Sequence, residues 1–473
     1  MTSNPSPFTR LRSTVARFIA PQTATRRFDA ASSASRWSGT PNFGPVGPEV
    51  LAAAGPVRSR ARYFSANNPW AASGVAALVT ALIGAGIVPA SNHADPATRK
   101  LLGDTFTRWV VRADADGLTD FWGLQAAAAR ALVIDGEAFV QTITEPTGIT
   151  LRLIPAEMVD AAHTVELDGG RRIVAGVEFD AAGRRVAYHV SPVRPTDTYL
   201  NYAPPVRVPA SEMIHVFAPI GAGQVRGISW LAPVLLRLGE LDQLEDALLV
   251  GAKISAMHAG FLVDQNGSAQ SPYDGEQTGS VLDSGLEPGT LKYVPPGFDI
   301  KFSTPQQAQQ TVEFARLQLR AVAAGLGVPE HLLTGDLGGA NYSSLRAGLV
   351  AFRQRIEQIQ FHTLIPQLVR PIWERVITFS VLSGDVSLAD LDDALPAEFY
   401  PPAQPWVDPM KDAEAEALLV EKGFKSRRQV VAERGFNIED LDAEIAADRQ
   451  RESALDLTFS GAEQKESKVA HTD

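Results

Sequence analysis

The sequence predicts an α+β protein that is mostly helical and contains more than one domain. Three long helical patterns, at 229–258, 304–324 and 343–380, follow a region of short β-strand patterns between residues 138 and 217. A chain of 473 residues is too long for one ordinary core. The chain has no cysteine, which excludes disulfides, thiolate metal sites and thiol nucleophiles and fits a reducing cytoplasm.

Residues 1–60 are expected to form a basic, flexible arm. This segment is rich in serine, proline and arginine and lacks apolar periodicity, whereas the whole chain has a net charge of -11. We expect the arm to dock on a partner or on nucleic acid. An arginine-rich, acid-poor start also resembles an organelle transit peptide, but Pro5, Pro7 and Pro21 interrupt any amphipathic helix.

The uncharged stretch 71–88 has nearly the length of a membrane span. It is rich in alanine and glycine and has few of the large apolar residues that drive membrane insertion. We therefore expect a buried helix that ends at Gly84, Gly86 and Pro89, and no membrane partner. The alternative, a membrane-attached protein, would require detergent for solubility.

The next elements alternate between helices and short strands. Two alanine-rich helices are expected at 96–112 and 119–134, and a turn at 135–137 follows them. Strands are expected at 138–143, 149–154, 172–179, 184–190 and 213–217. This region is therefore α+β with local antiparallel pairing.

Long helices dominate the rest of the chain. Ser229 is a candidate N-cap of the first, and Thr304 with Pro305 begins the second. Between them, 264–303 is rich in Gly, Pro, Ser and Asp, with short strands expected at 291–294 and 299–302. Pro366 and Pro371 are expected to kink the third helix. A final helical region covers 408–452.

A glycine-rich loop separates the second and third long helices. Gly325, Gly327 and Pro329 form a helix stop. Residues 334–340 then contain three glycines and one charge, so the backbone can approach another surface closely. Taken alone, the segment also fits an ordinary loop between two core helices.

No motif predicts catalysis, a cofactor or a metal site. The loop 221–227 reads GxGxxxG and not the GxGxxG of a dinucleotide site, and no P-loop, GxSxG or HExxH occurs. The eight histidines never pair at metal-ligand spacing, and a lone histidine such as His215 is more often a core residue. Glu137 beside Asp135 could be an acid/base pair, but neighbouring carboxylates on solvated faces are commoner. The alternative function is a soluble cytoplasmic enzyme with an atypical nucleotide-binding loop at 221–227.

Ten short motifs occur in one order across some 340 residues, and together they resemble the lambda-type portal proteins of tailed bacteriophages. The most specific are QVRGI at 224–228 and NYSS at 341–344. The ten are NNPW at 67–70, IGAGI at 83–87, FWG at 121–123, DGEAF at 135–139, LIPAE at 153–157, IHVF at 214–217, QVRGISWL at 224–231, GVP at 327–329, NYSSLR at 341–346 and WVDP at 406–409.

The resemblance implies a non-enzymatic ring, usually of twelve subunits, at one capsid vertex of a virion assembled in the bacterial host cytoplasm. Terminase packages double-stranded DNA through its channel, and the genome is later ejected through the tail. The implied partners are further copies of the chain, the terminase large subunit, the major capsid protein, the head-tail adaptor protein and DNA held without sequence specificity.

The resemblance also assigns names to the predicted segments. They are a flexible arm at 1–60, a wing at 61–228, stem helix 1 at 229–258, a clip at 259–303, stem helix 2 at 304–326, a tunnel loop region at 327–342, a long kinked helix returning to the wing at 343–401, a crown at 402–455 and a flexible tail at 456–473.

Candidate DNA-facing residues follow from this map. A conduit should hold DNA weakly, and an electronegative wall would keep the duplex centred. Four arginines near the channel (Arg316, Arg320, Arg346 and Arg353) either contact DNA or pair with carboxylates of neighbouring subunits. The tunnel-loop candidates are Gly335, Asp336, Leu337, Gly338, Gly339, Ala340, Asn341 and Tyr342, and the stem candidates are Glu240, Asp242, Glu245, Asp246, Arg316 and Arg320.

Overall fold

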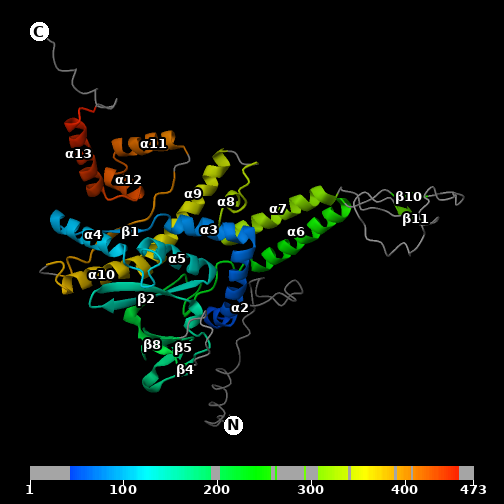
Figure 1. Cartoon of the computed structure of the whole chain (residues 1–473), viewed down its shortest axis with the longest axis horizontal. Coiled ribbons are helices and arrows are strands. Elements are labelled where there is room, and N and C mark those ends of the chain that lie inside the picture. Colours follow the sequence, from blue (N-terminus) through cyan, green and yellow to red (C-terminus); the bar gives the residue numbers. More distant parts are fainter. Residues whose placement is uncertain are drawn as a thin grey trace, which may run out of the picture. The chain divides into compact units, whose positions relative to one another are not determined.

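The structure is a computed structural model that describes residues 43–192, 203–256, 261–263, 292–294, 307–338, 342–387, 391–405 and 408–457. The chain divides into two units, Met1–Pro45 and Val46–Asp473. The second unit mixes helices with small sheets and is mostly helical, so the predicted fold class is confirmed (Figure 1). Most of the predicted arm, residues 1–42, lies outside the described residues. Residues 46–60 belong to a helix, so the arm boundary at residue 60 was placed too late.

Two helices meet at a sharp corner at the start of this unit. Helix α2 (Val46–Asn67) leads to α3 (Pro69–Ile83), and the Asn68 side chain caps α3 by accepting the N–H of Ala71 at 3.0 Å. Pro69 occupies the first turn of α3, where its missing N–H costs nothing. Helix α3 ends at Gly84 and is largely buried, as the sequence predicted. No helix in the described part of the chain is long and apolar enough to span a membrane.

A three-stranded antiparallel sheet packs against α5 (Phe121–Ile134), which in turn packs against α3. Strand β2 (Glu137–Glu145) is central and pairs with β3 (Gly148–Ile154) and β9 (Met213–Phe217). All three strands were predicted. Helix α4 (Pro96–Val110) packs nearby, with Phe106 and Trp109 in the same core as Phe121.

A second sheet has five antiparallel strands. They are β4 (Val165–Glu166), β5 (Arg172–Val174), β6 (Val177–Phe179), β7 (Arg185–Val190) and β8 (Val206–Pro209). The single strand predicted at 172–179 is two strands, because Ala175 and Gly176 turn the backbone through positive φ. The antiparallel pair β1 (Val88–Ser91) and β12 (Ala397–Tyr400) was not predicted, because its partners are more than 300 residues apart and have no local signal.

Two long helices, α6 (Leu235–Ala256) and α7 (Gln307–Leu326), lie side by side (Figure 1). The Arg237 guanidinium donates to the Gln318 side chain across them at 2.6 Å. Ser229 does not cap α6, because its hydroxyl donates to the Val133 carbonyl at 3.3 Å and the helix begins only after Pro233. Of the predicted clip, the structure describes a parallel pair, β10 (Phe261–Val263) and β11 (Lys292–Val294); the strand expected at 299–302 lies outside the described residues.

The third long helix is continuous from residue 342 to 382. It consists of α9 (Tyr342–Ile359), a π-helical stretch (Gln360–Val369) and α10 (Arg370–Leu382). Pro366, where a kink was expected, stands inside the π-helical stretch, whose wider turns accommodate a residue without an N–H, and the helix continues past it. Pro371 stands in the first turn of α10, where proline is tolerated.

Three short helices follow near the C-terminus: α11 (Pro409–Glu421), α12 (Arg427–Glu433) and α13 (Ile438–Ala454). Ion pairs connect them, with Lys425 to Glu416 at 3.0 Å and Arg427 to Asp442 at 2.6 Å. Of their described hydrophobic residues only Val431 is buried, so this region has hardly any core of its own.

Candidate functional site

The glycine-rich loop begins directly after the short helix α8 (Glu330–Thr334). Gly335 ends α8 with a φ of +70°, a conformation that favours glycine. The Asp336 carboxylate accepts the N–H of Gly338 at 2.8 Å, and Leu337 is exposed. Gly339, Ala340 and Asn341 lie outside the described residues, and Tyr342 is the first residue of α9. The first part of the loop is thus held by local hydrogen bonds and presents one apolar side chain.

The arginines near this loop pair within their own chain. Arg316 lies 3.8 Å from Asp336 and 3.4 Å from Glu313, and Arg320 lies 3.0 Å from Glu330. On α9, Arg346 pairs with Asp412 at 2.8 Å.

The guanidinium of Arg353 donates to the Pro405 carbonyl. The four arginines therefore have partners within their own chain. The two alternatives that the sequence left open, contact with DNA and pairing with a neighbouring subunit, did not include such partners.

The four predicted stem carboxylates fall into two kinds. Asp242 accepts a hydrogen bond from the Asn68 amide at 3.3 Å, and Glu245 accepts one from the Trp70 indole N–H at 3.2 Å. The α2–α3 corner thus anchors these two carboxylates. Glu240 and Asp246 are exposed and have no ion-pair partner in the described part of the chain. The sequence pattern could not separate the two kinds, because it did not reveal which face of α6 meets the corner.

Helix α3 also holds the end of α7. A Cβ on Gly74 would lie 2.8 Å from Cδ1 of Leu326 and 3.0 Å from Cδ1 of Leu333, so glycine permits this close approach. The Ser73 hydroxyl donates to the Leu332 carbonyl at 3.2 Å. The corner and its following turn therefore fix both long helices and the start of the glycine-rich loop.

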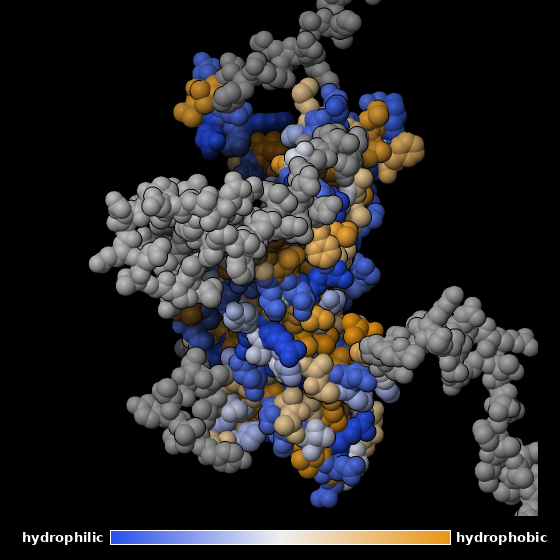
Figure 2. Space-filling model, turned by 90° about the vertical axis from the view of Figure 1, so that its right-hand side faces the viewer, coloured by the Kyte–Doolittle hydropathy of each residue, from blue (hydrophilic) through white to orange (hydrophobic). Residues whose placement is uncertain are grey.

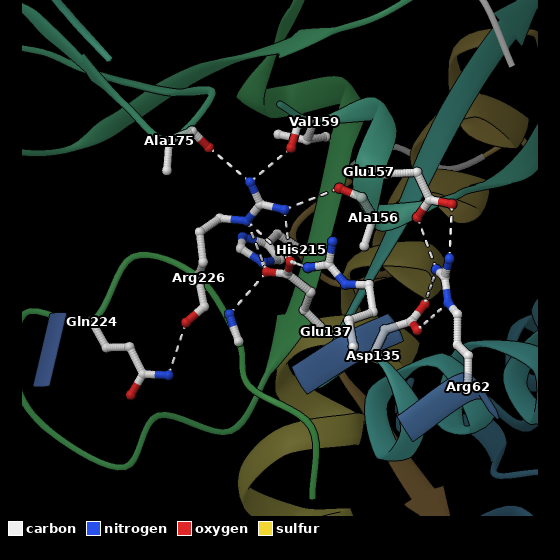
Figure 3. A network of polar contacts seen from close by, with 12 residues as sticks. Arg62, Asp135, Glu137, Ala156, Glu157, Val159, Ala175, His215, Gln224 and Arg226 are labelled. Carbon is white, nitrogen blue, oxygen red and sulfur yellow. Dashed lines mark hydrogen bonds and ion pairs between the residues drawn. The ribbon is translucent and has the colours of Figure 1, made fainter. Parts of the chain in front are cut away.

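A buried ionic cluster that no sequence motif indicated consists of Arg58, Glu137, His215 and Arg226, here named the Glu137 cluster (Figure 3). Glu137 is 0% exposed and Arg226 is 1% exposed. The Arg226 guanidinium donates to Glu137 at 2.7 Å, and Arg58 donates to the same carboxylate at 2.8 Å. The sequence favours a solvated carboxylate pair of Glu137 and Asp135. That interpretation was wrong for Glu137, since it lies at the start of a central strand.

Backbone groups complete the cluster. The N–H of Gly227 donates to Glu137 at 2.8 Å, and Arg226 donates to the carbonyls of Val159, Ala175 and Ala156 at 2.8 to 3.0 Å. Each remaining donor of Arg226 therefore has an acceptor, as a buried guanidinium requires. The QVRG motif is explained by this arrangement, which ties the loop before α6 to both sheets.

Gly136 and Gly227 allow the turn at 135–137 to contact the loop that precedes α6. A Cβ on Gly136 would lie 2.0 Å from the carbonyl carbon of Ile228, and a Cβ on Gly227 would lie 2.1 Å from the Gly136 carbonyl oxygen. Beside them, Arg62 donates to Asp135 at 2.7 Å and to Glu157 at 2.8 Å (Figure 3). The DGE motif and the RGI motif therefore form one backbone-to-backbone contact.

The cluster fixes the charges of its members. Burial alone would raise the pKa of Glu137, but the Arg226 guanidinium and the His215 hydrogen bond hold that pKa well below its usual range. Burial lowers the pKa of His215 to about 4, against the opposing effect of Glu137. His215 is therefore neutral at pH 7, with Nε2 donating to Glu137 at 3.1 Å. It is a core residue, as expected, although in the described part of the chain its Nδ1 has no hydrogen-bond partner.

A side chain of the loop 221–227 forms hydrogen bonds with the backbone of the same segment. The Gln224 amide accepts the N–H of Ile220 at 2.8 Å and donates to the Arg226 carbonyl at 2.8 Å. A Cβ on Gly221 would lie 2.6 Å from Val46. Among the described residues no group of acidic or histidine side chains could hold a metal ion. The polar groups of this loop are thus directed into the protein.

A model of the phage portal protein family, lambda family, matches residues 33–360. The chain belongs to this family. Among known portal proteins it is 26% identical to the probable portal protein of Halomonas phage phiHAP-1, over 92% of this chain and 88% of the relative. It is 23% identical to portal protein B of Escherichia phage lambda, over 68% of this chain and 67% of the relative.

A chain in the solved virion of a native gene transfer agent particle is 16% identical, with a TM-score of 0.40, over 89% of this chain and 96% of that chain. The family assignment identifies a portal protein, a structural and non-enzymatic component of the phage particle. The enzyme alternative with a nucleotide loop at 221–227 is therefore wrong.

Proposed function

We propose that this portal protein forms a ring of twelve subunits at one capsid vertex, through which terminase packages double-stranded DNA and through which the genome is later ejected. Family membership supports the role, and the twelvefold number is the one that the resemblance implies. The proposed partners are other copies of the chain, the terminase large subunit, the major capsid protein and a head-tail adaptor. Assembly takes place in the host cytoplasm.

In this proposal the α/β region up to residue 228 is the wing, α6 and α7 are the stem, and residues 259–303 are the clip. The loop 335–342 is the tunnel loop, the helix from 343 returns to the wing, and α11–α13 form the crown. This map is supported by the contacts of the α2–α3 corner with α6 and of the following turn of α3 with the end of α7.

One observation carries the proposal of weak, non-specific DNA contact. Arg316 and Arg320, beside the loop, are paired with carboxylates of their own chain, whereas Glu240 and Asp246 are exposed without such partners among the described residues. Each phosphate bound by a free cation would add affinity, and a ring would multiply that affinity. A surface with neutralised cations and free carboxylates lets the duplex slide. Leu337 and the glycines after it provide steric contact without reading bases.

The role of the loop can be tested by proline substitution. Gly338→Pro removes the N–H that Asp336 accepts and stiffens the backbone, so we expect rings in negative-stain images but a lower yield of packaged DNA. Gly339→Pro, outside the described residues, is expected to act in the same way. Gly338→Ala keeps the N–H and is the matched control, with packaging close to wild type. Normal packaging by both proline variants would refute the proposed role of the loop.

A further inference from the structure

The C-terminus of α7 is capped partly by its own backbone and partly by a side chain of α9. The carbonyls of Ala323 and Ala324, in the last turn, accept the N–H groups of the two residues that follow α7, at 3.0 and 3.1 Å. The carbonyl of Leu326, the last residue of α7, accepts instead from Nη1 of Arg355 at 2.7 Å. A residue from beyond the glycine-rich loop therefore completes the cap of the helix that precedes it.

Gly327 leaves the space that this guanidinium occupies. Its φ is +68°, a conformation that favours glycine, and a Cβ there would lie 1.2 Å from Nη1 of Arg355. Arg355 is half-buried and forms no ion pair among the described residues, and burial lowers the pKa of its guanidinium. A positive charge is favourable beside the free carbonyls at a helix C-terminus, so the end of α7 stabilises this cation.

Arg355 lies in the first part of α9 that packs against the rest of the chain. Residues 345–351 include no buried residue, whereas Phe352 and Ile356, on either side of Arg355, are 6% and 1% exposed. Within the described ranges, the bond from Arg355 to the Leu326 carbonyl is the only hydrogen bond between α7 and α9. The polar link between the two helices therefore depends on this one side chain.

We propose that Arg355 is a positioning residue, which holds the start of α9 beside the end of α7 and so sets the separation of the helices that flank the glycine-rich loop. On the α7 side, Leu326 and Leu333 pack on Gly74, which fixes the end of α7 and the short helix α8. Arg355 fixes the α9 side against the same point. The inference rests on the proposed function of the loop and names the residue that holds one of its two ends.

Spin labels can measure this separation, because the chain has no cysteine of its own. Leu317→Cys on α7 and Val350→Cys on α9 place the labels at positions that are 57% and 47% exposed. On the side of the molecule drawn in Figure 2, hydrophobic residues likewise reach the surface between charged ones. Substitution at such exposed positions has little effect on folding. Labelled chains are diluted with unlabelled ones, so that each distance lies within one chain.

The label pair is measured by pulsed electron paramagnetic resonance with and without the guanidinium. With Arg355 present, we expect one narrow distance distribution. Arg355→Ala should broaden the distribution and shift it to longer distances, because α9 loses its polar link to α7. Arg355→Lys keeps a cationic donor for the Leu326 carbonyl and should give a narrower distribution than alanine. A distribution that stays narrow in Arg355→Ala would overturn the inference.

Gly327→Ala tests the same contact from the α7 side. The new Cβ would displace the guanidinium, so the distribution should broaden although Arg355 is retained. Gly423→Ala is the matched control, because φ is +75° there and no atom lies within 4 Å of a Cβ, and its distribution should stay narrow. Equal distributions for the two glycine variants would overturn the proposed contact.

DNA packaging separates this inference from the proposed function. Arg355→Ala should leave rings in negative-stain images and lower the yield of packaged DNA, as is expected of Gly338→Pro. Normal packaging together with a broadened distribution would refute the role of Arg355 in positioning the loop. If the wild-type chain forms no ring, the proposed function fails, whereas the distances within one chain still test Arg355.

Discussion

The α/β region (residues 46–228) buries paired charges, whereas the described part of the α6–α7 pair keeps its ion pairs at the surface. In the α/β region, Glu137 and Arg226 are buried together and satisfied by hydrogen bonds. On the α6–α7 pair, Phe314 and Leu317 remain more than half exposed. The buried charges of the α/β region have their hydrogen-bond partners within the same region. Helices that leave apolar side chains in water gain most from a neighbour, which burial of that surface would stabilise.

The largest expected effect is from Glu137→Gln. The amide leaves Arg58 and Arg226 as buried cations without their carboxylate, which should lower the free energy of unfolding by about 3–5 kcal/mol. Urea denaturation of the purified protein measures this loss. Asp180→Asn, in an exposed pair with Arg184, is the control and should change little. Equal midpoints for both variants would contradict a stabilising role for the cluster.

The next effect should come from Gly136→Ala. The new Cβ would meet the Ile228 backbone, and the φ of +89° is strained for alanine, so we expect a loss of about 2–4 kcal/mol. Gly117→Ala is a matched control, since φ is +67° there but the space is open, and it should cost only about 1–2 kcal/mol. Thermal melts compare the two. A loss of stability no larger at Gly136 than at Gly117 would mean that the loop containing Ile228 can move away from the new Cβ.

A smaller effect, confined to acid, should come from His215. Its pKa is about 4 in the folded protein and higher when unfolded, so the unfolded state binds the proton more readily. The stability that neutral His215 contributes is fully present above pH 6.5 and is lost as the pH falls from there through about 4, by about 3 kcal/mol. His215→Gln should remove this part of the pH dependence between pH 6.5 and 4. Parallel stability curves for variant and wild type would show that His215 does not contribute.

The hydrogen bond between Trp70 and Glu245, which links the two regions, should contribute less to stability than the changes above. Trp70→Phe removes the indole N–H that Glu245 accepts and keeps the aromatic ring, so we expect a loss of about 0.5–1.5 kcal/mol. Hydrogen exchange of α6 amides measures whether the anchor loosens. Faster exchange should be confined to α6, and unchanged exchange there would show that Asn68 alone is sufficient.

The smallest effect on the single chain should be at Phe314. Phe314→Glu changes a half-exposed side chain, so the unfolding free energy of the monomer should stay within about 0.5 kcal/mol of wild type. Denaturation at low concentration measures it. A large loss would mean that Phe314 packs within its own chain, and the contrast between the regions would disappear.

Much of the secondary structure was predictable from local patterns. The helix at 69–83 and the strands β2, β3, β7 and β9 follow from apolar periodicity and from glycine and proline stops. The pairing of β1 with β12 was not predictable, because it joins segments more than 300 residues apart. The start of α6 was misplaced because Ser229 bonds to Val133, a contact outside its own segment.

The candidate site was predictable in part. The sequence indicated the glycine-rich loop and the stem carboxylates, but it could not show that Asp242 and Glu245 are anchored to the α2–α3 corner. The sequence showed the motifs DGE and QVRG as family markers, but it did not show that their residues form a buried ion pair. Their spacing of some 90 residues gives no sign that Glu137 and Arg226 meet.

The sequence by itself determined the fold class, the order of the main elements and the family, because periodicity, turn residues and short motifs are local properties of the chain. Only the tertiary structure decided which charges are paired and which apolar faces are left uncovered. Those two properties depend on contacts between segments that are far apart in the sequence, such as Gly136 with Ile228 and Gly74 with Leu326. Such contacts set the solvation of each side chain, and solvation decides whether a charge stabilises the core or remains free at the surface.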